Sequence, residues 1–299
     1  MSKKRNYKMV EESNIGCVVN VDKWLKENEE SFKPPVCNSI MAGGYLKIMF
    51  VGGPNVRKDY HMDQGEELFY MLKGDMCLKI MEKGEPKDIH IREGEVFVLP
   101  SRIPHSPQRN ANTLGLVIER ERADQWDGLR YYCEDGKTIL FQKYFHLRSL
   151  VQDFLPVIKE YFASEQYKTG VPIPGTTDED EEKFKVDRTS TVNTPFLLSE
   201  WVKENRKELD NQGKVLFEQG EFKVYANGEG NFSQQNPFES WIWLMNGKCK
   251  LQIDGQTAKQ MTSGDSIIVP QNQRFSLLIE GSESVCMIFT MDRNATPQK

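Results

Sequence analysis

The chain repeats part of its own sequence. Three segments return once, in the same order, at offsets of 177, 173 and 170 residues: Trp24–Asn28 from Trp201, Tyr70–Ile80 from Trp243, and Gly94–Pro100 from Gly264. One match could arise by chance, but three matches in register indicate a duplicated module. The small drift of the offset indicates short deletions in loops of the second copy, because surface segments tolerate them. The 299 residues therefore predict two domains of similar design.

Each copy has the pattern of an all-β fold. Short runs rich in β-branched and aromatic residues are separated by turn residues at intervals of about ten residues, which is typical of a sandwich or a barrel. Between the copies, residues 149–167 place apolar side chains at helical spacing and predict a helix. A second helix is predicted to start with Thr194 as its cap and Pro195 in its first position.

These elements set the expected domain limits. Residues 1–167 form a first, catalytic domain, residues 168–194 a linker, and residues 195–299 a second domain. The linker combines proline and glycine with five consecutive acidic residues, Asp178–Glu182, so we expect it to be solvated.

Composition narrows the classes of function. The net charge of −5 and the pI of about 5.6 come without a basic stripe, so no nucleic acid partner is expected. No apolar run approaches the roughly 18 residues that cross a bilayer, so no membrane is expected either. The six cysteines have no Cys-x-x-Cys spacing, which favours reduced thiols in a cytosolic protein over disulfides or a thiolate metal site.

The first copy carries a metal-binding pattern. In order along the chain, the pattern consists of His61, Glu67, Gly74, Gly94, Pro100 and His105. These are the two motifs of the cupin fold, a small jelly-roll barrel or double-stranded β-helix whose inward side chains converge on one ion. Asp63 holds the place where many cupins have another histidine, and we expect it beside the metal site or facing solvent. The predicted fold class is all-β, with two cupin barrels in one chain and a few helices at their junction.

The types of ligand in this pattern indicate which metal it binds. Two imidazoles and one carboxylate on one side of an ion leave its other positions open, which suits non-haem iron(II) oxygenases. A structural zinc site would be closed by a fourth residue.

The second copy lacks all three candidate ligands. The repeat offsets put Gln234, Ser240 and Phe275 at the three ligand positions. Glutamine, serine and phenylalanine cannot replace two imidazoles and a carboxylate. We therefore predict that only the first barrel holds a catalytic metal and that the second barrel is a scaffold.

Charged residues near the motifs are candidates for substrate binding. Arg57 lies four residues before His61, Arg109 lies four residues after His105, and Glu119 lies on the strand that follows. An arginine inside a barrel must be paired or must bind an anion, because burying an unpaired charge is costly. A substrate carboxylate is the natural partner of Arg109, and a structural ion pair between Arg109 and Glu119 is the alternative.

With these residues in place, the sequence resembles the 3-hydroxyanthranilate 3,4-dioxygenases in their long two-cupin form. The likeness spans nearly the whole chain and is densest in segments such as GGPNVRKDYH, from Gly52, and PSRIPHSPQR, from Pro100. The resemblance implies one iron(II) per chain, bound by His61, Glu67 and His105. It also implies that Arg57 lies beside dioxygen, that Glu67, Arg109 and Glu119 bind the substrate, and that the catalytic groups are Arg57, Arg109 and Glu119.

The reaction that the resemblance implies is an extradiol-type ring cleavage. It converts 3-hydroxyanthranilate and dioxygen to 2-amino-3-carboxymuconate semialdehyde, which closes to quinolinate, a precursor of NAD in the kynurenine pathway. The second, cysteine-bound iron of the shorter bacterial members is not expected, because its Cys-x-x-Cys spacing is absent. Two alternatives stay open: another metal-dependent cupin enzyme, and a non-catalytic cupin that binds a small ligand. Two barrels in one chain favour a monomer.

Overall fold

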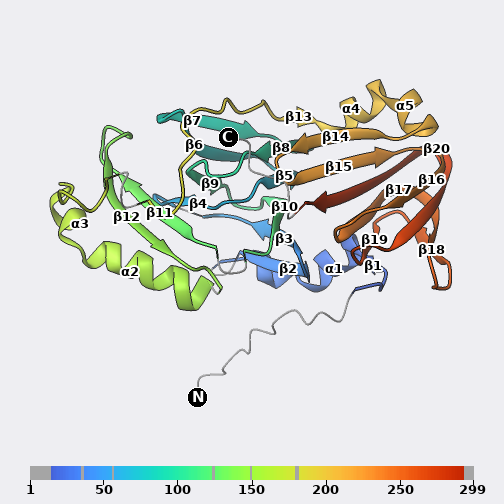
Figure 1. Ribbon diagram of the computed structural model, residues 1–299, viewed down its shortest axis with the longest axis horizontal. Coiled ribbons are helices and arrows are strands. Elements are labelled where there is room, and N and C mark those ends of the chain that lie inside the picture. The colour runs from blue at the N-terminus through green and yellow to red at the C-terminus, as the bar shows by residue number, and fades with distance from the viewer. Residues whose placement is uncertain are drawn as a thin grey trace, which may run out of the picture. The chain divides into compact units, whose positions relative to one another are not determined.

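The computed structural model describes residues 15–34, 37–55, 57–122, 125–148, 150–178 and 182–292. The chain is built mostly of strands (Figure 1), as predicted. Contacts group it into two compact units. The first-barrel unit consists mainly of Val51–Leu198, and the second-barrel unit joins Ser199–Thr296 to the N-terminal segments up to Phe32 and Asn38–Phe50. This grouping differs from the limits set by the repeat, because the start of the first copy belongs to the second-barrel unit. None of the described helices is long and apolar enough to cross a membrane.

The first-barrel unit contains two antiparallel sheets. One has the strand order β12-β11-β4-β9-β6-β7, and in the other the strands of this unit follow the order β13-β8-β5-β10. The bounds are β4 (Tyr60–Met62), β5 (Glu67–Lys73), β6 (Met76–Glu82), β7 (Glu85–Ile91), β8 (Glu95–Leu99), β9 (His105–Arg109), β10 (Leu114–Arg120), β11 (Asp127–Tyr132), β12 (Ile139–Phe145) and β13 (Phe196–Leu197).

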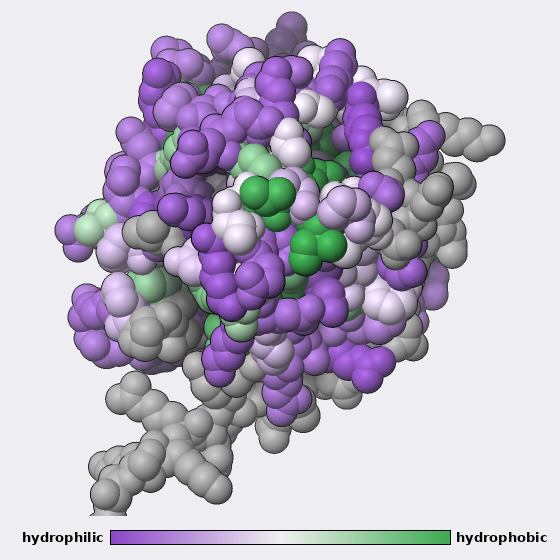
Figure 2. Space-filling model, turned by 90° about the vertical axis from the view of Figure 1, so that its left-hand side faces the viewer, coloured by the Kyte–Doolittle hydropathy of each residue, from purple (hydrophilic) through white to green (hydrophobic). Residues whose placement is uncertain are grey.

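Helices follow the last large strand of this unit, as predicted. A π-helical turn, η3 (Leu150–Phe154), leads into α2 (Leu155–Ala163) and α3 (Glu165–Thr169). Val157 and Tyr161 of α2 pack on a cluster of buried side chains from β11 and β12. The outer face of this end is mostly hydrophilic, with a small group of hydrophobic residues (Figure 2). Through Val157 and Tyr161, α2 packs on β11 and β12 of the sheet that also contains β4 and β9.

The second predicted helix starts later than expected. Phe196 and Leu197 form β13, paired with Val96 and Glu95 of β8, and the helix α4 (Leu198–Glu204) follows. Thr194 and Pro195 therefore lie outside the helix, and the prediction for these two residues was wrong. The pairing with β8 keeps the chain extended up to the start of α4.

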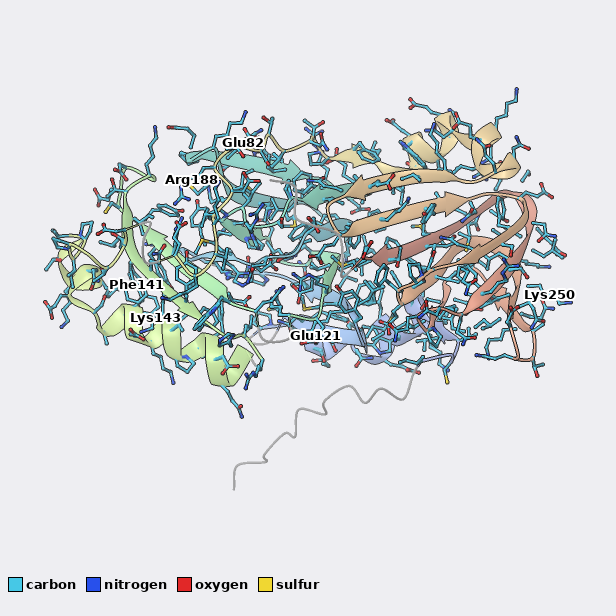
Figure 3. The ribbon with its side chains drawn as sticks, viewed as in Figure 1. Glu82, Glu121, Phe141, Lys143, Arg188 and Lys250 are labelled. Atoms are coloured by element: carbon cyan, nitrogen blue, oxygen red, sulfur yellow. The ribbon has the colours of Figure 1, made fainter. Side chains whose placement is uncertain are left out.

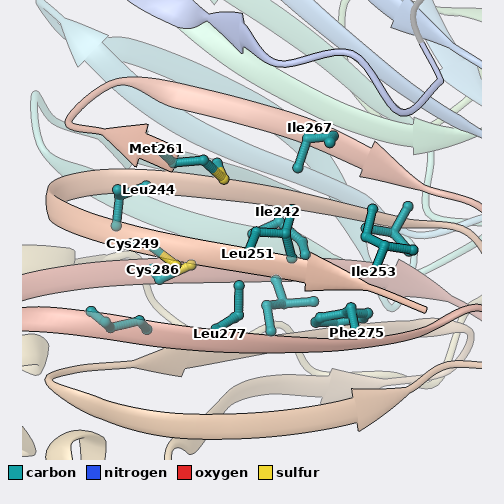
Figure 4. Packing of buried hydrophobic residues seen from close by; sticks show 13 residues of the cluster. Ile242, Leu244, Cys249, Leu251, Ile253, Met261, Ile267, Phe275, Leu277 and Cys286 are labelled. Atoms are coloured by element: carbon teal, nitrogen blue, oxygen red, sulfur yellow. The ribbon is translucent and has the colours of Figure 1, made fainter. Parts of the chain in front are cut away.

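The second-barrel unit holds one large antiparallel sheet of strand order β1-β19-β17-β20-β15-β14, in which β16 also pairs with β20 and β18 with β17. Its strands and helices are β1 (Val19–Asn20), α1 (Val21–Glu27), η2 (Glu29–Phe32), β2 (Asn38–Gly43), β3 (Leu46–Gly52, whose last two residues count to the other unit), α4 (whose first residue, Leu198, counts to the other unit), α5 (Arg206–Asn211), β14 (Lys214–Gln219), β15 (Phe222–Asn227), β16 (Gly230–Gln235), β17 (Ser240–Ile253), β18 (Lys259–Thr262), β19 (Asp265–Val269) and β20 (Arg274–Met291). Buried apolar side chains fill its interior (Figure 4).

The leading strands of the two copies are exchanged. Val19 of β1 pairs with Ser266 of β19, and Phe196 of β13 pairs with Val96 of β8. Val19 and Phe196 are repeat equivalents, and so are Val96 and Ser266. Each copy's leading strand therefore completes a sheet of the other copy, which explains why the N-terminal segment groups with the second-barrel unit.

The last part of the predicted linker is not a solvated segment. The side chain of Glu182 is 7% exposed and forms ion pairs of 2.5 Å with both Arg130 and Arg188. Farther along, the Val192 N–H donates to Glu82, at 2.8 Å. Figure 3 labels Glu82 and Arg188 in the first-barrel unit. Residues 182–192 thus form a strap that is fixed to this unit. This differs from the predicted solvated linker, because Glu182, the last acid of the run, pairs with the buried Arg130.

The strap gives a first prediction. Glu182→Ala removes the carboxylate that pairs with the buried Arg130, and we expect the free energy of unfolding to fall by about 3 kcal/mol. The matched control is Glu160→Ala, which removes the exposed pair with Lys143 and should cost less than about 1 kcal/mol. Urea denaturation of both variants measures the difference. Equal, small losses would show that the strap is not held by this pair.

Candidate metal centre

The three candidate ligands meet inside the first-barrel unit. β4 pairs with β9 so that His61 stands directly opposite His105, and Glu67 is the first residue of β5. The imidazole rings are 5.4 Å apart, and a ligand atom from each of the three residues lies within 4.8 Å of the other two. All three side chains are buried. The structure therefore brings together the residues that the sequence singled out, in a geometry that can hold one metal ion.

Glu67 is ionised in this setting. Burial alone raises the pKa of its carboxyl, but the interaction with His105, followed by those with His61 and Arg122, outweighs burial and lowers the pKa well below its usual range. The Nε2 atom of His105 lies 3.4 Å from a carboxylate oxygen of Glu67. A buried carboxylate that stays charged is suited to bind a cation.

Each imidazole has one nitrogen occupied by the protein. His105 Nδ1 lies 3.0 Å from the carbonyl oxygen of Ile103, so this nitrogen donates its proton and Nε2 is left with a lone pair. His61 Nε2 lies 2.8 Å from a carboxylate oxygen of Asp127, which leaves Nδ1. Each ring therefore keeps one nitrogen that can face a metal.

A buried ion network borders the ligands on one side. The guanidinium of Arg122 donates to both oxygens of Glu119, at 2.8 and 2.6 Å, and to Asp63 at 3.3 Å. Its Nε lies 2.9 Å from Asp127. Burial and then the charge of Glu67 raise the pKa of Asp63 well above its usual range. Asp63 is thus buried. Of the two positions expected for it from the sequence, beside the metal site or facing solvent, it has the first.

The network corrects the alternative considered for Glu119. Glu119 pairs with Arg122 and not with Arg109, so the structural ion pair that was the alternative for Arg109 is not formed. The sequence analysis missed both Arg122 and Asp127. Arg122 belongs to the charged run Glu119–Arg122, which is typical of a solvated surface, so the sequence held little signal for its burial.

Arg109, at the end of β9, is buried without a counter-ion among the described residues. It is 5% exposed, and its Nε has no hydrogen-bond partner in this part of the chain. Burial, followed by the charge of Arg57, lowers the pKa of Arg109 to about 10, while Glu67 has a smaller, opposite effect. A buried guanidinium in this state is a candidate binding site for an anion.

The loop before β4 is clamped to β9. The Arg109 N–H donates to the side-chain oxygen of Asn55 at 2.6 Å, and the Asn55 amide donates to the carbonyl of Pro107 at 2.9 Å. A Cβ at Gly53 would lie 2.0 Å from the carbonyl oxygen of Asn110, so only glycine permits this approach. The clamp explains why these residue types occur together in the two motif segments.

Arg57 is held beside the ligands by two neighbours. Its guanidinium forms an ion pair with the buried Asp59 and lies 5.4 Å from the ring centre of Phe154. The Phe154 ring in turn lies 6.2 Å from the ring of His61. Arg57 and His61 thus both lie near Phe154, and the ion-pair partner of Arg57 is Asp59.

The equivalent positions of the second barrel have the same register with different chemistry. Gln234 pairs with Phe275 across β16 and β20, as His61 pairs with His105. The Gln234 amide donates to Asn236, and the Asn236 amide donates to Ser240. Phe275 is 1% exposed and belongs to the apolar core. The three positions thus satisfy one another or pack, and offer no set of two imidazoles and a carboxylate.

Comparison with known proteins supports the resemblance seen in the sequence. The family model for 3-hydroxyanthranilic acid dioxygenase matches residues 13–162. A 3-hydroxyanthranilate 3,4-dioxygenase from Nematostella vectensis is 48% identical over 271 residues, which cover 90% of this chain and 97% of the relative. The enzymes of the same name from Xenopus tropicalis and Rattus norvegicus are 46% and 44% identical, over 88% and 92% of this chain and 94% and 96% of their own.

The similarity to solved structures is lower. A cupin 2 conserved barrel domain protein from Leptotrichia buccalis covers 93% of this chain and 97% of its own, with a TM-score of 0.48 and 10% identity. The assignment rests on the sequence matches, which span nearly the full length of this chain and of its relatives. The chain belongs to the 3-hydroxyanthranilate 3,4-dioxygenase family.

Proposed function

We propose that this protein cleaves the ring of 3-hydroxyanthranilate with dioxygen, using one iron(II) per chain, and so forms 2-amino-3-carboxymuconate semialdehyde for quinolinate and NAD synthesis. Membership of the family supports the reaction class. The observation that carries the proposal is the buried guanidinium of Arg109, which forms no ion pair among the described residues and lies on the same strand as the candidate ligand His105. A metal ligand and an anion site on one strand suit an aromatic substrate that carries a carboxylate.

The metal would be held by His61, Glu67 and His105. Two imidazoles and a carboxylate, all buried, form the donor set that suits iron(II) with open positions. When bound, the iron supplies the redox chemistry that dioxygen needs and open positions for the hydroxyl and amine of the substrate. The protein itself would exclude water from the three ligand side chains and hold their ligand atoms close together.

Arg109 would bind the substrate carboxylate. A guanidinium and a carboxylate can form two parallel charge-assisted hydrogen bonds, which fix direction as well as position. Binding would also remove the cost of a buried unpaired charge on Arg109. Fixing the ring in this way sets which of its carbons face dioxygen, and orientation of this kind can contribute roughly 7–11 kcal/mol in favourable models.

Glu119 and Arg57 would complete the pocket. Glu119 is oriented by two hydrogen bonds from Arg122 and would accept a proton from the substrate's hydroxyl or amine. Arg57, held by Asp59 and Phe154, would lie beside dioxygen and stabilise negative charge that develops there. Glu67 would contact the substrate from the metal side.

Two further predictions belong to the same proposal. The two barrels in one chain favour a monomer, and the lack of disulfide spacing together with a metabolic role favours a cytosolic location. Sedimentation of the purified chain tests the first, and imaging of the tagged chain in its own cells tests the second.

Replacing Arg109 tests the proposed substrate contact. We expect Arg109→Gln to raise the KM for 3-hydroxyanthranilate by roughly 10- to 100-fold, because a charge-assisted hydrogen bond is lost. The KM for 2-aminophenol, which lacks the carboxylate, should change far less. Steady-state kinetics with both substrates measure the ratio. If both KM values rose by the same factor, the carboxylate would not be the partner of Arg109.

Metal removal and return test the site. The chelated protein should be inactive towards 3-hydroxyanthranilate, and anaerobic addition of iron(II) should restore ring cleavage, seen as product absorbance, at one iron per chain. His105→Ala should abolish tight iron binding, whereas Ser240→Ala in the second barrel should leave the stoichiometry at one. Iron retained by His105→Ala, or a second equivalent lost with Ser240→Ala, would contradict the assignment of the metal to the first barrel.

A further inference from the structure

Asp127 stands behind one of the candidate ligands. It is the first residue of β11, is completely buried, and places one carboxylate oxygen 2.8 Å from Nε2 of His61. β11 pairs with β4 so that Leu129, two residues further along, is the strand partner of His61. Backbone pairing therefore determines which carboxylate meets this ring.

Arg122 holds Asp127 in turn. Its Nε lies 2.9 Å from the same oxygen of Asp127 that faces His61, while its other nitrogens bond Glu119 and Asp63. One guanidinium is thus shared by three buried carboxylates. Without its charge these buried acids would lose the cation that they share, which is costly, and the position of Asp127 would no longer be fixed from behind.

We propose that Asp127 and Arg122 are positioning residues for the metal site, with Asp127 fixing the ring and the tautomer of His61 and Arg122 fixing Asp127. The inference rests on the proposed metal site and extends it to a second layer of residues. A neutral imidazole with its proton on Nε2, donated to Asp127, presents the lone pair of Nδ1 to a metal. The proton would otherwise be free to occupy Nδ1, which would block the metal.

The partner of His105 shows that the two ligands are oriented by different means. Its Nδ1 donates to the backbone carbonyl of Ile103, two residues away on its own chain segment. That support is local and neutral, whereas the support of His61 comes from a charged side chain on another strand. Carboxylate partners of this kind raise the basicity of a ligating histidine. Their loss typically lowers metal affinity by roughly 10- to 100-fold.

The test measures metal affinity without turnover. We expect Asp127→Asn to weaken binding of iron(II), and of cobalt(II) as a spectroscopic probe, by roughly 10- to 100-fold in anaerobic chelator competition, and to alter the visible absorption of the cobalt form. Arg122→Gln should weaken binding in the same direction. Asp127→Glu, which keeps the charge, should recover part of the affinity that Asp127→Ala loses.

The matched control is Glu182→Gln, which disturbs a buried pair with Arg130 in the same unit but outside the metal site. It should lower the midpoint of thermal unfolding and leave the affinity for cobalt(II) unchanged. Wild-type affinity and an unaltered cobalt spectrum in folded Asp127→Asn would overturn the positioning role. Failure of the proposed metal site itself is separate, because it would appear as unchanged metal binding in His61→Ala.

Discussion

The pairing of β4 with β9 is the contact on which the site depends. β4 has only three residues, and it lies between β9 on one side and β11 on the other. Because successive side chains of a strand point to opposite faces, a slip of one residue would turn His61 away from His105. On its other side β4 pairs with β11, and this second pairing places Asp127 behind the ring. A short strand with two neighbours thus sets the ligand pair and its support together.

Much of the site was predictable because its signals are local in the sequence. Each motif combines a turn glycine or proline with an inward side chain, so His61, Glu67 and His105 could be named from spacing alone. The repeat offsets also put Gln234 and Phe275 at the positions of His61 and His105, and the two pairs have the same strand register. Deletions had shifted the offset, but the strand ends were kept.

The parts that could not be predicted depend on contacts between distant residues. Asp127 lies 66 positions from His61, and only the order of strands in the sheet brings them together. Glu182 ends a run of acidic residues that is typical of a solvated segment. Only the folded structure shows that a buried arginine, Arg130, lies beside it. The exchange of leading strands also depends on contacts between distant residues. In addition, β1 and β13 are only two residues long, so the sequence has no clear strand pattern there.

Comparison of the two barrels shows what loss of the ligands requires. A buried imidazole or carboxylate without a partner is costly, so a position that no longer binds metal must become apolar or find a hydrogen bond. Phe275 follows the first route, and Gln234 and Ser240, joined through Asn236, follow the second. The pair of Gln234 and Phe275 has the register of His61 and His105 because both pairs also belong to their sheets.

Two buried arginines of the first barrel have opposite surroundings. Arg122 is surrounded by Glu119, Asp63 and Asp127, so its charge is compensated within the protein and its position is rigid. Arg109 forms no ion pair with a carboxylate among the described residues, and burial, followed by the charge of Arg57, lowers its pKa to about 10, so its charged form is disfavoured relative to water. A buried arginine can stabilise the fold or bind a ligand. The two cases differ in whether carboxylates of the protein already pair with its guanidinium. Arg109 lies on the strand that also carries His105, so an anion paired with this guanidinium would be oriented beside the candidate metal ligands, as the proposed function requires.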